Sequence, residues 1–283
     1  MLNEKLHDIR TELQGKWGIL AVFLLGWLLC LKYILGGNLP IGMIIGISPL
    51  ILLIGGLFIK KPMVLFAVLF TVNYFIMGSL RYLIHHPLPL PVSVIMDILY
   101  VMLVCILLVK CVWGHYEIRK IGISILFIYL IWVLYCLIQA FNNTCDTGFE
   151  FTAWFKDIRP YALHPIYIII IFAILFRKIE HIKWFLYIWA IFTLLAATKG
   201  YWQRNHGFDQ YEWWWLWMGG ERTHLIHSGV RYFSFFSDAA NFGSNMAFCT
   251  VTFGLTALYI KGWKSKIFFL GVALASGYGL MIS

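Results

Sequence analysis

The chain has 283 residues, of which 61% are hydrophobic and 12% are charged, and it carries a formal net charge of +9. Soluble globular domains contain about 25% charged residues, so this composition excludes an ordinary soluble enzyme or binding domain. A mean hydropathy of +0.80 is typical of a protein embedded in a lipid bilayer.

The first sixteen residues place Leu2, Leu6, Ile9 and Leu13 along one helical face, which predicts an amphipathic cytoplasmic segment, 1–16, on the inner leaflet. This segment is too long and too mixed in charge to begin a removable signal peptide, and no small-residue cleavage site follows it. We therefore expect the first apolar stretch to be a retained membrane anchor.

Apolar stretches close to the ~20 residues that cross a bilayer recur along the whole chain. We predict nine spans, at about 17–35, 39–59, 62–80, 92–113, 121–141, 160–176, 184–200, 241–260 and 267–283. The expected fold class is all-α, a polytopic transmembrane helical bundle that forms a single domain over residues 1–283. A long outer connection, 201–240, is expected between the seventh and eighth spans.

Basic residues predict the orientation. With the amino terminus in the cytoplasm, 14 of the 22 Lys and Arg residues fall in inner segments and 7 in outer segments, as the positive-inside rule requires. Lys outnumbers Arg by 11 to 3 inside, whereas Arg outnumbers Lys by 5 to 2 outside. Because guanidinium binds phosphate or carboxylate through a bidentate fork, the outer arginines suit an anionic ligand. Pairing with the seven outer acids is the alternative.

Polar groups inside the predicted spans are few. Asp97 lies in the outer third of the fourth span, level with Lys32, and either forms an ion pair with it or faces a vestibule. Pro160 and Pro165 flank His164 at the start of the sixth span, which indicates either a bent helix mouth or a tolerated kink.

Several chemistries have no support in the sequence. The six cysteines show neither a disulfide framework nor metal-ligand spacing. The chain contains no Walker loop, no dinucleotide fingerprint and no His-Glu-x-x-His motif. We therefore predict no cofactor, no metal and no nucleic-acid partner.

The long outer connection is rich in aromatic and basic residues. The tryptophan-rich run 211–217 suits the headgroup level of a membrane, and sugar stacking is the alternative. After it come Arg222, His224, His227 and Arg231, which supply hydrogen-bond donors and possible proton carriers. We expect this connection to cover a site.

The run from Arg231 to Asn245 brings a cation, a carboxylate and two amides to an apolar span. Polar groups at such a place are commonly functional. The simpler alternative is that Asp238 caps the following helix, while Asn241 and Asn245 join neighbouring helices by hydrogen bonds.

The run reads Arg231-Tyr-Phe-Ser-Phe-Phe-Ser-Asp238-Ala-Ala-Asn241-Phe-Gly-Ser. Together with the predicted topology, it resembles the O-antigen ligase and O-antigen polymerase superfamily of bacterial envelope enzymes. The resemblance covers the whole chain in topology and about fifteen residues in motif. It implies a multi-pass protein of the bacterial inner membrane that transfers a glycan from a polyprenyl diphosphate carrier to a glycolipid or glycan acceptor. Arg231 would then contact the carrier diphosphate.

The sequence also departs from that family. The ligases carry a catalytic histidine and further arginines in another outer loop, beyond the span corresponding to 267–283, and nothing here matches that histidine. We therefore expect the 283 residues to be a fragment or a shortened member of a longer protein.

The predicted site follows from the chemistry of transfer. Departure of a diphosphate develops negative charge that fixed arginines stabilise, and the acceptor hydroxyl needs a base. The candidate catalytic residues are Arg231, His224, His227 and Asp238, and the candidate substrate-binding residues are Arg231, Arg222, Arg204, Arg159, Arg81 and Asn241.

Two other classes of function stay open. A polyprenyl-glycan flippase or other secondary transporter would also have many spans and polar groups, but nearer the midplane than Asp97, His164, Lys199 and Asp238 are predicted to lie. An inert scaffold, in contrast, would pair its outer arginines with outer acids and bind no lipid diphosphate. In each case we expect membrane lipids among the partners.

Overall fold

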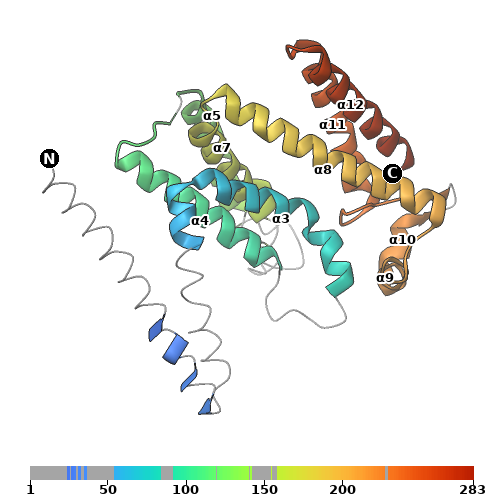
Figure 1. Ribbon diagram of the computed structural model, residues 1–283, viewed down its shortest axis with the longest axis horizontal. Coiled ribbons are helices and arrows are strands. Elements are labelled where there is room, and N and C mark those ends of the chain that lie inside the picture. Colours follow the sequence, from blue (N-terminus) through green and yellow to red (C-terminus); the bar gives the residue numbers. More distant parts are fainter. Residues whose placement is uncertain are drawn as a thin grey trace, which may run out of the picture. The chain divides into compact units, whose positions relative to one another are not determined.

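The computed structural model describes residues 24–25, 27–29, 31–32, 35–36, 54–83, 92–118, 120–139, 141, 154, 158–226 and 229–283 (Figure 1). The chain divides into two compact units, Met1–Val64 and Leu65–Ser283. The described residues of the first unit are mostly helical. The predicted segment 1–16 and most of the first two predicted spans lie outside the described residues.

The next three predicted spans coincide with helices. Helix α3 covers Pro62–Leu83, α4 covers Val92–Val112 and α5 covers Lys120–Gln139. Each contains about the number of apolar residues that a hydrocarbon core requires. Pro62 begins α3 at a position where the missing N–H of proline costs nothing.

A π-helical turn, η1 (Arg159–Leu163), leads directly into α7 (His164–Leu175). Pro165 has no N–H to donate to the carbonyl oxygen of Tyr161, one helical turn earlier. The indole Nε1 of Trp132 in α5 donates to that oxygen instead, at 3.2 Å. The predicted proline feature is therefore a π turn tied to α5.

Helix α3 contacts its neighbours through phenylalanine rings. Phe66 packs edge-to-face against Phe172 in α7 and Phe176 just after α7, with ring centroids 5.8 and 4.9 Å away. It packs in the same way against Phe185 in the following helix, at 5.7 Å. Edge-to-face contacts of this kind add to the area that the rings bury. The rings thus join α3, α7 and the helix that follows α7.

Helices α8 (Ile179–His206), α11 (Ala239–Tyr259) and α12 (Trp263–Ile282) pack together. Figure 1 shows α11 and α12 as the red pair beside α8. The core of this group is apolar and includes Ala190, Cys249, Phe253, Phe269, Val272 and Ala273.

Two glycines permit close contact between these helices. A Cβ atom at Gly200 of α8 would lie 2.9 Å from Cζ of Phe242, and a Cβ atom at Gly279 of α12 would lie 2.9 Å from Sδ of Met246. Contacts this short require a neighbour to shift. Small residues at such points let membrane helices approach closely.

The predicted connection 201–240 is shorter than expected and largely structured. Helix α8 continues to His206, past the predicted boundary at residue 200. After it come α9 (Gln210–Trp215), η2 (Leu216–Gly220), α10 (Glu221–His224) and the antiparallel strands β1 (Leu225–Ile226) and β2 (Gly229–Val230).

Five helices among the described residues are long and apolar enough to cross a membrane: Pro62–Tyr82, Ile95–Val112, Gly122–Gln139, Ile179–His206 and Trp263–Ile282. The apolar helix Arg159–Leu175 is shorter. Helix α11 has 21 residues, but its amides and hydroxyls lower its hydropathy. The chain is therefore an all-α helical membrane protein, and the predicted total of nine spans is not confirmed.

Candidate functional site

The turn formed by residues 233–237 lies just before α11 and is held by Arg81. This arginine lies in the last turn of α3, and its side chain is buried. Its Nη1 donates to the carbonyl oxygen of Ser234 at 3.1 Å, and its Nη2 donates to that of Ser237 at 3.1 Å and to that of Phe236. Because these donors serve the backbone, the structure does not favour the predicted role of Arg81 in substrate binding.

Two aromatic rings enclose the same guanidinium. The Cζ atom of Arg81 lies 4.5 Å from the ring centroid of Trp215 and 4.1 Å from that of Phe233. Desolvated cation–π contacts of this kind are favourable. Arg81 thus joins α3, α9 and the turn, and its loss would leave buried carbonyl oxygens without donors.

Ser234 connects the turn to α8. Its φ angle is 51°, a left-handed conformation that is uncommon outside glycine. Its N–H donates to Oε1 of Gln203 at 2.9 Å, and its hydroxyl donates to the carbonyl oxygen of Ala196 at 2.7 Å. These bonds stabilise the left-handed conformation.

A charged cluster joins α8 to α9. Glu212 accepts from Nε2 of Gln203 at 2.8 Å, and Nζ of Lys199 lies 2.8 Å from the same oxygen and 3.3 Å from Oδ2 of Asp209. Asp209 and Glu212 form a capping box at the start of α9. Burial acts to raise the pKa of Asp209, but hydrogen bonds from Tyr82 and the backbone, with the charge of Lys199, hold it below its usual value.

His224 is a buried cap rather than an accessible base. The Ala239 N–H donates to Nε2 at 3.1 Å, and Nδ1 lies 2.7 Å from the carbonyl oxygen of Gly220. An imidazole that accepts at Nε2 and donates at Nδ1 is neutral. Burial, assisted by the charges of Arg81 and Arg231, lowers the pKa of His224. The structure therefore does not favour the predicted catalytic role of His224.

Asp238 caps α11 with the help of Asn241. Its Oδ1 accepts from the Asn241 N–H at 2.8 Å, while its Oδ2 accepts from the Ser237 hydroxyl at 2.9 Å and from Nδ2 of Asn241 at 2.8 Å. Burial acts to raise the pKa of Asp238, but these hydrogen bonds lower it. A carboxylate with a lowered pKa is a weak base, so the capping alternative describes Asp238 and Asn241 better than a catalytic or binding role.

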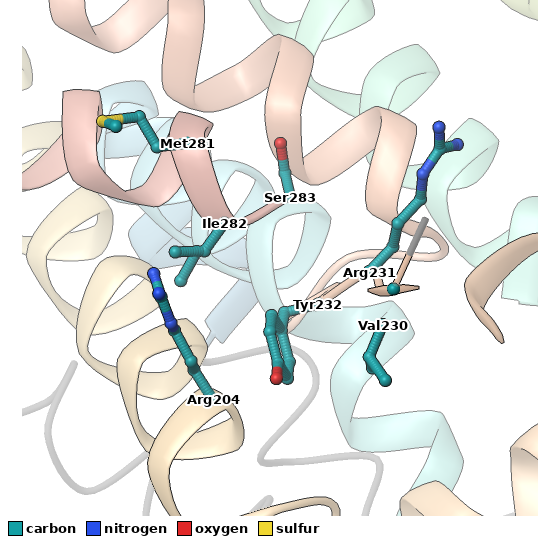
Figure 2. A pocket seen from close by; sticks show the side chains of 8 residues that line it. Arg204, Val230, Arg231, Tyr232, Met281, Ile282 and Ser283 are labelled. Carbon is teal, nitrogen blue, oxygen red and sulfur yellow. The ribbon is translucent and has the colours of Figure 1, made fainter. Parts of the chain in front are cut away.

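An open pocket of about 470 Å³ lies beside this assembly. Its arginines come from separate elements, Arg204 from α8 and Arg231 from the segment after β2, and Figure 2 shows them on either side of Tyr232. The lining residues are Arg204, Gly229, Val230, Arg231, Tyr232, Met281, Ile282 and Ser283. The pocket thus gathers two of the predicted site residues.

The two arginines differ in their contacts. The exposed side chain of Arg231 makes no hydrogen bond or ion pair with any residue that the structure describes, although its backbone N–H donates to the carbonyl oxygen of His224 at 2.8 Å. Nη1 of Arg204 lies 3.5 Å from the hydroxyl of Tyr278. Two guanidinium forks at one pocket suit an anion with several oxygens, such as a diphosphate or a carboxylate.

The remaining predicted residues lie elsewhere. Arg222 is exposed on α10 and does not line the pocket. His227 lies outside the described residues. Tyr232 and the residues at the end of α12 are lining groups that the sequence analysis missed.

Arg159 belongs to a second cluster of ionisable groups. Its Nη1 lies 2.6 Å from Oδ2 of Asp97, and Nε2 of His164 lies 2.8 Å from the other carboxylate oxygen. The ring of Tyr100 stacks on His164 with centroids 5.2 Å apart. The described partners of Asp97 are therefore Arg159 and His164, and the pairing with Lys32 stays a prediction.

Within the described residues, no three His, Cys, Asp or Glu side chains are grouped so that they could hold a metal ion. Comparisons with protein-family models, curated proteins and solved structures found no match to this chain. The basis for a function is therefore the chemistry of the pocket, together with the resemblance carried by the run that begins at Arg231.

Proposed function

We propose that this protein is a membrane glycan transferase of O-antigen ligase or polymerase type. It would move a saccharide from a polyprenyl diphosphate carrier to a glycolipid or glycan acceptor on the outer face of the bacterial inner membrane. The observation that carries the proposal is that Arg204 and Arg231 both line one open pocket at the end of apolar helices. A lipid-linked diphosphate has both the charge and the membrane location that this arrangement suits.

In the proposed reaction, the acceptor hydroxyl forms a new bond to C1 of the sugar while the bond from C1 to the diphosphate oxygen breaks. Negative charge develops on the departing diphosphate, so Arg204 and Arg231 would bind the transition state more tightly than the ground state. The hydroxyl proton passes to a base. Since His224 and Asp238 are engaged at the start of α11, His227 is the candidate base in this proposal.

The distribution of charge supports the proposed orientation. Helix α8 has Lys178 and Lys183 at its beginning and Arg204 in its last turn. Lysines are typical of cytoplasmic anchors, whereas arginine forks suit phosphate binding. The amino terminus would then be cytoplasmic and the arginine pocket would face the periplasm.

A second function, secondary transport of a lipid-linked glycan, is favoured by one observation. Asp97, Arg159 and His164 form a partly buried ionic cluster between apolar helices. Ionisable groups at such positions are common in transporters. In this alternative, the cluster would couple ion or proton movement to transport.

The test is glycan transfer from a polyprenyl diphosphate donor, measured in membranes that contain the full-length protein and normalised to protein amount. Arg204→Lys and Arg231→Lys should each lower the rate by roughly 10²–10³, the effect of losing one oriented donor to a developing charge. A lysine keeps the charge but loses the bidentate fork. Arg222→Lys is the matched control and should transfer at the wild-type rate, because Arg222 does not line the pocket.

Wild-type transfer by Arg231→Lys would remove the central assignment. Equal losses in all three variants would indicate a general role of surface arginine rather than of this pocket. Loss of lipid-linked glycan translocation in Asp97→Asn, in a protein that shows no transfer activity, would favour the transporter.

A further inference from the structure

We infer that a groove between α8, α11 and α12, at the lysine-bearing end of α8, binds an anionic phospholipid. The cavity has a volume of about 690 Å³. Its lining includes Lys183, Leu186, Tyr187, Leu255, Lys261 and Ser265. The inference does not depend on the proposed glycan transfer.

The groove combines cationic groups with apolar walls. Lys183 comes from α8 and Lys261 from the turn between α11 and α12, and both side chains are exposed. Leu186 and Leu255 line the groove from facing helices. A ligand that fits both features needs an anionic head and a hydrocarbon chain. Basic pockets between membrane helices on the cytoplasmic side bind lipid headgroups of this kind.

A fixed hydroxyl pair adds a hydrogen-bond donor. The hydroxyl of Tyr187 donates to Oγ of Ser265 at 2.8 Å. The ring of Tyr187 is held against Phe269, with centroids 4.9 Å apart, and against Phe268, at 5.6 Å. Because Ser265 accepts the tyrosine hydrogen, its own hydroxyl hydrogen is available to a phosphate oxygen.

The position of the groove along α8 favours a lipid over a free phosphate. Lys183 and Arg204 are 21 residues apart in one helix. At 1.5 Å per residue this separation is about 30 Å, close to the thickness of the hydrocarbon core. The two lysines would therefore lie at one headgroup layer when the arginines lie at the other. The predicted orientation makes the lysine layer the cytoplasmic one, where anionic lipids attract basic groups.

The test is native mass spectrometry of the purified protein in dodecyl maltoside, titrated with dioleoyl phosphatidylglycerol. The double variant Lys183→Gln/Lys261→Gln should bind this lipid about 30-fold more weakly, the combined effect expected for two lysines near an anionic headgroup. The matched control Lys264→Gln/Lys266→Gln removes the same charge from the same end of the bundle but outside the groove. It should bind the lipid like the wild type.

A further variant tests the apolar wall without changing charge. Leu255 is 52% exposed, so Leu255→Trp should fold, fill part of the groove and weaken phosphatidylglycerol binding. Dioleoyl phosphatidylcholine and glycerol phosphate should both bind much more weakly than phosphatidylglycerol. The inference would be overturned by equal losses of affinity in the two double variants, or by wild-type affinity of Leu255→Trp. It would also be overturned if phosphatidylcholine or glycerol phosphate bound as tightly as phosphatidylglycerol.

Discussion

Three ionisable side chains beside α11 have structural roles, although the sequence suggests catalysis for His224 and Asp238 and substrate binding for Arg81. Arg81 donates to the carbonyl oxygens of the 233–237 turn, His224 accepts from the Ala239 N–H, and Asp238 accepts from the Asn241 N–H. Buried or capping polar groups with such partners stabilise a fold when every bond is made. Residue type alone does not distinguish this use from proton transfer.

The neutral state of His224 predicts a pH dependence. Its pKa is lower in the folded protein than the ordinary value of ~6.5, so the unfolded chain binds the proton more readily. The contribution of His224 to stability is complete above the unfolded pKa and is lost as the pH falls below it, by up to ~1.4 kcal/mol per pH unit. Thermal unfolding in detergent should therefore show a steeper fall in Tm from pH 7.5 to 5.5 for wild type than for His224→Gln.

His206→Gln is the control for this measurement, because His206 is exposed at the end of α8. It should leave the wild-type pH dependence unchanged. If His224→Gln and wild type lose the same Tm between the two pH values, the assigned neutral tautomer is wrong.

At the scale of elements, the sequence predicts the apolar part of each helix better than its end. Residue 200 is the predicted end of the seventh span because polar residues follow it, yet α8 continues to His206. Gln203 is buried there between Glu212 and Ser234. The spacing of Lys199 and Gln203 by four residues is a signal of a shared polar face. Their partners come from distant segments, which helical periodicity cannot identify.

The π turn before α7 is also predicted only in part by the sequence. Pro160 and Pro165 predict an irregular helix start, and the structure has one there. The sequence does not indicate which group donates to the Tyr161 carbonyl oxygen. In the structure this donor is the indole of Trp132, in another helix. That contact depends on how α5 packs, not on the prolines.

Because α8 is closely packed, we expect one added methyl group on it to lower the free energy of unfolding. Gly200→Ala should lower the free energy of unfolding by about 1–3 kcal/mol, because the new Cβ would meet the Phe242 ring at 2.9 Å and that ring is buried. Gly271→Ala in α12 is the matched control, since a Cβ there meets nothing within 4 Å. Thermal unfolding of the two variants in one detergent measures the difference, and equal Tm values would contradict the described packing.

At the scale of the whole molecule, composition predicts a helical membrane protein, and the structure confirms this class. The sequence also names Arg204 and Arg231, which the structure brings to one pocket. It does not indicate that Tyr232 and Ile282 line the same pocket. These residues meet through the packing of α8 with α12 and through the hydrogen bond from the Tyr232 N–H to the Ile282 carbonyl oxygen at 3.4 Å. Contacts between residues so distant in the chain leave no pattern in the sequence.

The topology can be tested with single cysteines in a background without the six native ones. Lys178→Cys and Lys264→Cys should react with a membrane-impermeant thiol reagent only from the cytoplasmic side, and Trp217→Cys, which replaces an exposed side chain, only from the outer side. The positions 217 and 264 are separated by α11, so opposite labelling also requires that α11 cross the membrane. Reaction of both positions from one side would refute the predicted arrangement.

Helix α8 has 28 residues and is therefore about 42 Å long, more than the ~30 Å of a typical hydrocarbon core. A helix tilts when its apolar stretch exceeds the local hydrocarbon thickness, and the angle grows as the acyl chains shorten. The pocket with Arg204 and the groove with Lys183 lie at opposite ends of α8. Tilting of α8 therefore changes the depth of both sites relative to the headgroups at the same time. Under the proposed function, acyl-chain length would therefore control how readily a lipid-linked substrate reaches Arg204.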